Sequence, residues 1–146
     1  MRFLALSATA LLLGACSVFS IGFGRKVTEE ELILRTEIKE YYDEAGAAFA
    51  AGNAERLADL YDAGIARPMT KDQIRAWGED FFKKHGPARF KVEKIDFEGV
   101  GHLSAVVELT YRVETNDGNG SFRGVERDEL VKHGRHWFIS AWTKER

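Results

Sequence analysis

Hydrophobic residues between positions 28 and 52 recur at intervals of three and four, which is the period of an amphipathic α-helix. Thr28 is placed to cap this helix, since its hydroxyl can accept a hydrogen bond from the amide of Glu31. Gly52 ends it, because glycine readily adopts the left-handed conformation that closes a helix. The pattern therefore predicts a long first helix, whose apolar face consists of Leu34, Ile38, Tyr41, Tyr42, Ala45, Ala48 and Phe49.

Two shorter helices are predicted next. Asn53 caps the first of them, and the second begins with a capping box over residues 70–73 and ends at Gly86. The connection between them, residues 62–69, has room for only a very short strand around Ile65. Each helix has one apolar side, formed by Leu57, Leu60 and Tyr61 in the first and by Ile74, Trp77 and Phe81 in the second.

From Ala88 onward the hydrophobic period changes from about 3.6 to 2, which predicts strands. A one-residue phase slip between Val92 and Ile95 predicts a bulge in the first strand. Residues 116–120, Asn-Asp-Gly-Asn-Gly, predict a tight hairpin turn. The predicted fold class is therefore α+β: three N-terminal helices packed on one face of an antiparallel sheet of about four strands.

The N-terminal segment has a different pattern. Arg2 precedes an uncharged run that ends in small residues and the single cysteine, Cys16, which is typical of a secretory signal. Residues 13–16, Leu-Gly-Ala-Cys, resemble the bacterial lipobox. This resemblance implies that the peptide before Cys16 is cleaved and that the cysteine sulfur and the new N-terminus receive acyl chains such as palmitate.

The lipobox divides the chain into a lipoprotein signal peptide (1–15), a lipidated tether (16–26) and one folded domain (27–146). Each lipid CH₂ removed from water contributes about 0.8 kcal/mol, so two or three acyl chains make attachment to a membrane durable. We therefore expect a cell-envelope protein whose domain lies outside the cytoplasm. The competing interpretations are an uncleaved anchor over residues 3–24 and an unmodified Cys16.

Position 17 bears on which membrane would hold the lipid. Ser17 stands where aspartate would favour retention in the inner membrane of some Gram-negative bacteria. The serine therefore favours the outer membrane, with the domain facing the periplasm.

Length and charge narrow the function classes. A chain of 146 residues fits one domain with a proper core. Its 21 basic and 23 acidic residues give a formal net charge of −2, and nothing in this balance suggests a nucleic-acid partner. Neither a phosphate-binding glycine loop nor a dinucleotide fingerprint occurs, and we expect no cofactor.

The order of these parts resembles the nuclear transport factor two-like superfamily, and its polyketide cyclase-like branches in particular. The likeness spans residues 31–142 and rests on the long first helix, the step 51–53 into 57–61, and the closing segments 127–131 and 134–139. It implies a cystatin-like, cone-shaped barrel whose curved sheet wraps the first helix around a pocket. Members include isomerases, dehydratases, cyclases, ligand binders and assembly modules, so fold alone does not define function.

Enzymes of this superfamily usually place an aspartate or tyrosine in the pocket, sometimes with a histidine, often between the second and third helices. Residues 63–68 contain no acidic residue or histidine, which weakens the expectation of catalysis. The remaining catalytic candidates are Glu126 and Asp128 on the third strand. Both carboxylates face the barrel interior in one register of that strand, where burial would raise a pKa toward use as a general base.

The register of the third strand stays open at this level. Inward-facing Phe122, Gly124 and Leu130 would place both carboxylates inside. Inward-facing Val125 and Val131 would place them outside, among salt-bridged surface charges.

Aromatic residues on several elements could line a pocket for an apolar ligand or simply fill the core. The predicted set consists of Tyr42, Trp77, Phe81, Tyr111 and Trp137. His133 and His136 straddle a turn, but no third ligand is placed by spacing, so no metal site is predicted.

The last strand carries large apolar side chains on both faces. Strict alternation places Trp137 and Ile139 on one face and Phe138 and Trp142 on the other. With the first face on the helices, Phe138 and Trp142 would be exposed and would need a cover. We therefore expect them to form an interface in a homodimer or with an envelope protein partner.

Two functions from different classes follow. The leading one is a lipid-anchored envelope protein whose domain binds a small apolar ligand or another protein without catalysis. The alternative is an isomerase- or dehydratase-type enzyme that moves a proton with Glu126 or Asp128 and uses Tyr42 or Tyr111 as a hydrogen-bond donor. An open apolar cavity with a carboxylate of raised pKa would favour the enzyme, and a filled cone would favour the interaction module.

Overall fold

The computed structural model describes residues 26–145, and the predictions for residues 1–25 lie outside this part of the chain. No helix in residues 26–145 is long and apolar enough to cross a membrane. The four strands form a single antiparallel sheet in the order β1-β2-β3-β4, which confirms the predicted α+β class. The elements are α1 (Glu29–Ala51), α2 (Ala54–Ala58), α3 (Lys71–His85), β1 (Ala88–Val100), β2 (Ser104–Thr115), β3 (Phe122–His133) and β4 (His136–Lys144).

Helix caps set the helix boundaries as predicted. The Thr28 hydroxyl accepts a hydrogen bond of 3.1 Å from the Glu31 amide, and Gly52 ends α1 with a positive φ of 59°. At α3 the Thr70 hydroxyl and the Gln73 side chain each accept from the other residue's backbone amide, which completes the capping box. These local bonds satisfy amides that a helix N-terminus leaves without partners.

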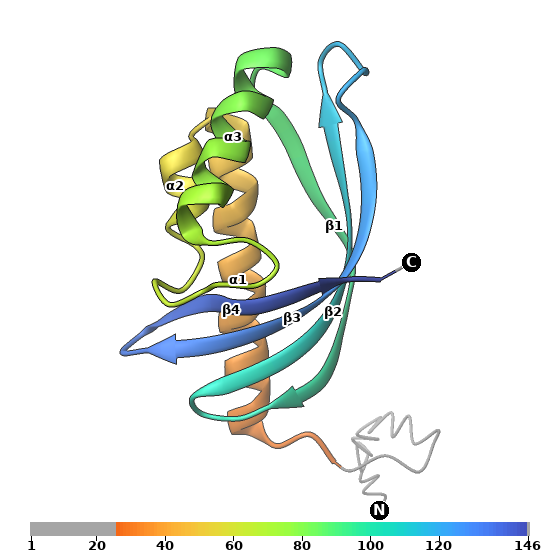
Figure 1. Cartoon of the computed structure of the whole chain (residues 1–146). Helices are drawn as coiled ribbons and strands as arrows, with labels where there is room; N and C mark the ends of the chain where they lie inside the picture. Colours follow the sequence, from red (N-terminus) through yellow and green to blue (C-terminus); the bar gives the residue numbers. More distant parts are fainter. Residues whose placement is uncertain (1–25, 146) are drawn as a thin grey trace, which may run out of the picture.

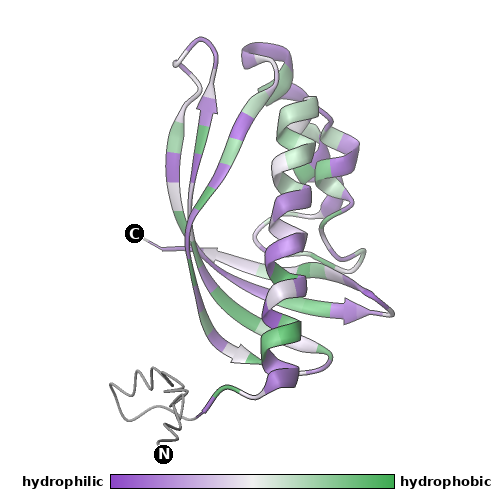
Figure 2. Cartoon of the chain, turned by 180° about the vertical axis from the view of Figure 1, so that it is seen from behind, coloured by the Kyte–Doolittle hydropathy of each residue, from purple (hydrophilic) through white to green (hydrophobic). Residues whose placement is uncertain are grey.

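The sheet curves around α1, which runs along its concave side, and α2 and α3 lie beside the C-terminal half of α1 (Figure 1). Hydrophobic and hydrophilic positions alternate along the strands (Figure 2). The inner positions of the sheet pack against α1 and the outer ones are mostly charged or polar, so one face of the sheet is buried. The largest fully buried apolar side chains are Ile38, Val107, Leu109, Val113 and Leu130.

Breaks in strand register alter which residues face inward. The break between Val92 and Lys94 in β1 confirms the bulge predicted there. A further break lies between Phe97 and Gly99 in β1. The break in β4 leaves Ser140 between two paired residues, since Leu130 pairs with Ile139 and Glu129 with Ala141. An extra residue in one strand shifts the following side chains by one position, so they change face.

The bulge in β4 corrects the predicted orientation of Trp142. Trp142 pairs with Asp128 and faces the interior with it, whereas strict alternation along β4 placed Trp142 outside with Phe138. Lys144 follows at the next inner position, opposite Glu126.

The connection between α2 and α3 forms no strand at Ile65. Instead, Tyr61 makes an isolated parallel bridge with Ile139, in which the Ile139 amide donates to the Leu60 carbonyl at 3.1 Å. The Ile65 amide donates back to the Asp62 carbonyl at 3.1 Å, so a local turn uses the group that a strand would need. The side chain of Ile65 is nevertheless buried in the core.

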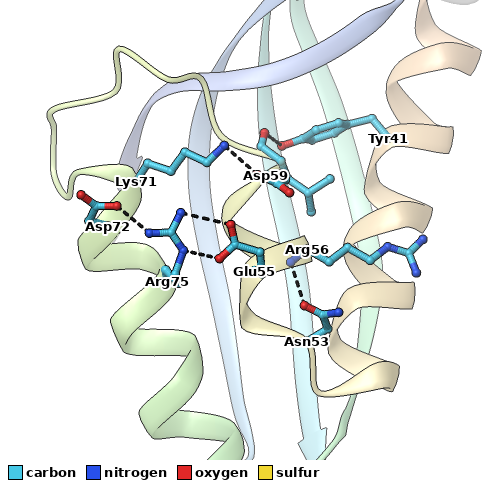
Figure 3. Close-up of polar contacts among 9 residues, drawn as sticks. Tyr41, Asn53, Glu55, Arg56, Asp59, Lys71, Asp72 and Arg75 are labelled. Carbon is cyan, nitrogen blue, oxygen red and sulfur yellow. Dashed lines mark hydrogen bonds and ion pairs between the residues drawn. The ribbon is translucent and has the colours of Figure 1, made fainter.

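Ion pairs connect α2 and the residue after it to α3 (Figure 3). Arg75 on α3 forms a bidentate pair with Glu55 on α2 and a 2.6 Å bond to Asp72. Lys71 approaches Asp59 at 2.8 Å. These exposed pairs each contribute little energy, but together they orient the two helices that form one wall of the cavity described next.

Candidate functional site

A cavity of about 470 Å³ opens between the helices and the concave face of the sheet. Most of its wall is apolar, contributed by Phe49, Leu57, Ile74, Trp77, Phe81 and Phe90. Polar side chains gather on the sheet side, where Tyr111, Arg123, Glu126 and Lys144 line it. This size and composition fall in the range of small-molecule binding sites.

Stacked rings build the apolar wall. Phe49 stacks on Phe90 with ring centroids 5.4 Å apart, and Trp77 stacks on Phe81 at 5.2 Å. Phe122 from β3 meets Phe81 edge-on at 6.3 Å. Because aromatic rings have few rotatable bonds and pack tightly against one another, this wall is largely preformed.

Both candidate carboxylates face inward. Asp128 pairs with Val107 and Glu126 with Leu109, and both partners are buried on the inner face of β2. The structure thus has the register with Gly124 and Leu130 inside, which was one of the two that the sequence left open.

Asp128 lies behind the cavity and is fully buried. The Tyr42 hydroxyl on α1 donates a 2.6 Å hydrogen bond to its Oδ2, and Oδ1 has no hydrogen-bond partner within residues 26–145. Burial raises the pKa of Asp128 to about 7, although the bond from Tyr42 opposes this rise. The indole Nε1 of Trp142, directly across the strand pair, is likewise buried without a partner in the described part of the chain.

Glu126 lies in the cavity wall, one inner position from Asp128. Its Oε2 accepts a 3.2 Å hydrogen bond from the Tyr111 hydroxyl. Burial, followed by the charge of Asp128, raises the pKa of Glu126 to about 8, while Tyr111 and Lys144 act in the opposite direction. Near neutral pH the two carboxyl groups therefore hold about one proton between them, and they titrate as a pair.

Gly124 allows Tyr111 to reach Glu126. A Cβ at position 124 would lie 2.4 Å from Cζ of Tyr111, so only glycine leaves room for the ring to cross β3. Burial raises the pKa of Tyr111 well above its ordinary value, and the nearby Glu126 raises it further. The phenol therefore remains a hydrogen-bond donor at physiological pH.

The cavity rim at the end of α3 contains an Asp–His pair. Nδ1 of His85 lies 3.1 Å from Oδ2 of Asp117 in the β2–β3 turn, and the His85 ring packs closely over Gly120. Hydrogen bonds from Thr115 and from His85 lower the pKa of Asp117 to about 2. This contact joins α3 to the β2–β3 turn beside the cavity.

The structure divides the predicted aromatic set. Trp77, Phe81 and Tyr111 line the cavity. Tyr42 does not, because it lies behind Asp128 as its hydrogen-bond donor. Trp137 is buried elsewhere, where its Nε1 donates to Glu37 at 3.1 Å.

The residues predicted for an interface are separated as well. Trp142 belongs to the cavity wall, and Phe138 lies on the opposite face of β4 beside the His133 ring, with ring centroids 5.6 Å apart. The homodimer or envelope protein partner stays a prediction. His133 contacts Asp62 at 2.8 Å, and residues 26–145 contain no group of three or more side chains suited to a metal ion.

The predicted pocket set omitted much of the cavity wall, including Phe49, Phe90 and Arg123. Lys144 and Trp142 were missed because of a break in strand register. Both follow the β4 bulge at Ser140, which reverses the faces of the last residues of the strand. A second phase slip in the hydrophobic pattern after Ile139 was the only signal that could have located them.

No protein-family model and no curated protein sequence matches this chain, but solved structures share its fold. A variant of Rv3472, a Mycobacterium tuberculosis protein of unknown function, has a TM-score of 0.67 at 16% identity, over 80% of this chain and 75% of that one. A cystatin-like protein from Nostoc punctiforme has a TM-score of 0.63 at 13% identity, over 83% and 94% of the two chains. An NTF-2 like protein from Shewanella oneidensis has a TM-score of 0.62 at 14% identity, over 77% and 98%.

These similarities define the class of fold. The chain has the cystatin-like, nuclear transport factor two-like α+β architecture. At such low identity the likeness concerns the fold alone, so function has to be argued from the cavity.

The carboxyl pair predicts an unusual dependence of stability on pH. Between about pH 5 and 8 the folded protein holds more protons on Glu126 and Asp128 than the unfolded chain does, so the free energy of unfolding should fall as pH rises. Glu126→Gln should reduce this slope by up to about 1.4 kcal/mol per pH unit. Urea denaturation at several pH values measures it.

Glu129→Gln is the matched control, since Glu129 is exposed on the outer face of the same strand. The free energy of unfolding of Glu129→Gln should change with pH as steeply as that of the unmodified protein. An unchanged slope in Glu126→Gln would contradict the raised pKa of Glu126.

Proposed function

We propose that this domain binds a small, largely apolar molecule in the cavity, with the polar group of that molecule against Glu126. The observation that carries the proposal is an open cavity of about 470 Å³ with stacked aromatic walls and one polar end. A filled cone, typical of a purely structural or assembly module, would not have this space.

The polar end supports orientation of the ligand as well as its uptake. The Tyr111 hydroxyl donates to Glu126 and holds it in place, and the protonated form of Glu126 can donate to a ligand. In apolar surroundings such groups discriminate strongly, because a ligand that leaves them unpaired forgoes their hydrogen bonds. The aromatic wall provides most of the affinity and these two groups provide the orientation.

Uptake can be tested with N-phenyl-1-naphthylamine, a neutral probe whose fluorescence rises in apolar sites. We expect saturable binding to the soluble domain, residues 27–146. Met69 lines the cavity from the loop before α3, so Met69→Trp should occupy part of the space and weaken binding by about tenfold or more.

Met69→Leu is the matched control and should bind the probe as the unmodified domain does, because it conserves volume. Circular dichroism checks that both variants fold. Absence of saturable binding, or equal binding by both variants, would refute ligand uptake in this cavity.

The carboxyl pair favours a second candidate function, proton transfer at the bound molecule. A carboxyl group with a pKa near the working pH is suited to general acid–base catalysis, and Glu126 lies in the wall of the cavity beside a tyrosine donor. Ionised Glu126 would take a proton from a carbon next to a carbonyl group. As Glu126 becomes protonated, the Tyr111 hydroxyl would turn from Glu126 and donate its hydrogen bond to the developing oxyanion. This is the step shared by isomerases and dehydratases.

The exchange of α-protons of 2-tetralone for deuterium, followed by NMR in D₂O, measures this step. The protein should accelerate exchange more as pH rises through about 8, because the base must be ionised. Glu126→Gln should lower the catalysed rate by about a hundredfold or more, and Glu129→Gln should leave it unchanged. A catalysed rate that Glu126→Gln does not lower would exclude Glu126 as the base.

We further propose that the domain is held at the cell envelope by lipid on Cys16, facing the periplasm from the outer membrane in a Gram-negative host. The support is the sequence Leu-Gly-Ala-Cys at residues 13–16 behind an apolar run. A short lipidated tether would keep the cavity close to a membrane surface.

Intact-mass analysis of the membrane fraction should find a chain that begins at acylated Cys16. The Cys16→Ser variant should carry no acyl groups and should not be cleaved at this position. Recovery of Met1 at the N-terminus of the unmodified, membrane-bound protein would refute lipidation at this cysteine.

A further inference from the structure

The polar end of the cavity contains one cationic side chain that forms no ion pair with a carboxylate of the described residues. Lys144 lines the cavity directly opposite Glu126 in the β3–β4 register. None of the ion pairs in residues 26–145 involves Lys144, and its charge acts on Glu126 only at longer range. The other cation in the wall, Arg123, already binds Glu93 at 2.7 Å.

The remaining polar groups at this end can donate hydrogen bonds. The Tyr111 hydroxyl donates to Glu126, which leaves the carboxyl hydrogen of protonated Glu126 available to a ligand. A lysine ammonium group flanked by donors is suited to an oxygen acceptor that carries negative charge. The opposite end of the cavity is aromatic and has no charged group apart from the His85–Asp117 contact at the rim.

We propose that the ligand is an amphipathic monocarboxylate, whose carboxylate pairs with the Lys144 ammonium group and accepts a hydrogen bond from Glu126. This inference rests on the proposed ligand uptake and names the chemical class of the ligand. The apolar body of the ligand lies between the Phe49–Phe90 and Trp77–Phe81 stacks.

The charge balance selects a monoanion. Below their pKa values of about 7 and 8, Asp128 and Glu126 are mostly protonated and neutral, so the positive charge of Lys144, the one cation lining the described cavity that has no closer partner, is left for a ligand. A phosphate dianion would exceed the single positive charge of Lys144, in a cavity whose wall is otherwise mostly apolar, which is costly. A single carboxylate can be accommodated when the carboxyl pair takes up a proton.

Two probes with the same ring system separate charge from apolar contact. 1-Naphthaleneacetate carries the carboxylate, and 1-naphthaleneacetamide is its neutral counterpart. Displacement of N-phenyl-1-naphthylamine at pH 6.5 should show tighter binding of the acetate to the soluble domain. Lys144→Gln should weaken acetate binding about three- to tenfold and leave acetamide binding unchanged.

Lys94→Gln is the charge-matched control. Lys94 is exposed on β1, pairs with Asp96, and does not line the cavity. It should leave the binding of both probes unchanged. An equal effect of Lys94→Gln and Lys144→Gln on acetate binding would reduce the role of Lys144 to net charge and overturn the proposal.

The affinity for the acetate should also fall as pH rises from about 6.5 to 9, because ionised Glu126 repels it. The groups around Glu126 are Asp128 on its own strand, Tyr111 on β2, Lys144 on β4, Tyr41 and Tyr42 on α1, and Tyr61 after α2. The four tyrosines have raised pKa values and stay neutral over this range. Glu126→Gln should remove most of the pH dependence and keep a donor for the carboxylate.

Two outcomes distinguish the failure of this inference from that of the proposed function. Binding of N-phenyl-1-naphthylamine that is displaced equally well by both probes, with no effect of Lys144→Gln, would overturn the monocarboxylate while the cavity remains a binding site. Absence of binding by all three probes would refute both proposals.

Discussion

One hydrogen bond, between Tyr42 and Asp128, holds a buried carboxyl group between α1 and the sheet. It joins the middle of α1 to the centre of β3, and both side chains are buried. A carboxyl group in such surroundings is tolerated only when it is bonded, protonated or both. A one-residue slip of β3 would turn Asp128 to the outer face and break its hydrogen bond with Tyr42. The same slip would bury a charged outer residue in place of Asp128, so both effects disfavour that register.

The same burial produces the chemistry of the cavity. Burial of Glu126 raises its pKa, and the charge of Asp128 one inner position away raises it further, into the range where a carboxyl group can either donate or accept a proton. Gly124 contributes by giving Tyr111 the space to reach Glu126. One structural requirement, packing a polar group against α1, thus prepares a neighbouring carboxyl group for binding or catalysis.

The sequence predicted the parts of the fold that local chemistry specifies. Thr28, Gly52 and Thr70 mark helix ends through bonds within a few residues, and the bulge after Val92 appears directly in the hydrophobic pattern. Sequence reasoning also selected Glu126 and Asp128, but it could not choose between the two registers. That choice depends on Tyr42, which lies 86 residues before Asp128, and no local pattern contains this contact.

The errors of sequence reasoning lie where one bulge changes the face of a strand. The alternation of large apolar residues in β4 placed Trp142 outside with Phe138, and the bulge at Ser140 reverses this. The same reversal places Lys144 inside. Without the bulge, Trp142 and Lys144 would not line the cavity. Trp142 would instead lie on the outer face of β4 with Phe138, where the two would form a larger apolar surface. The bulge at Ser140 therefore determines whether the last residues of β4 face a partner or the interior. In this protein it directs Trp142 and Lys144 into the cavity.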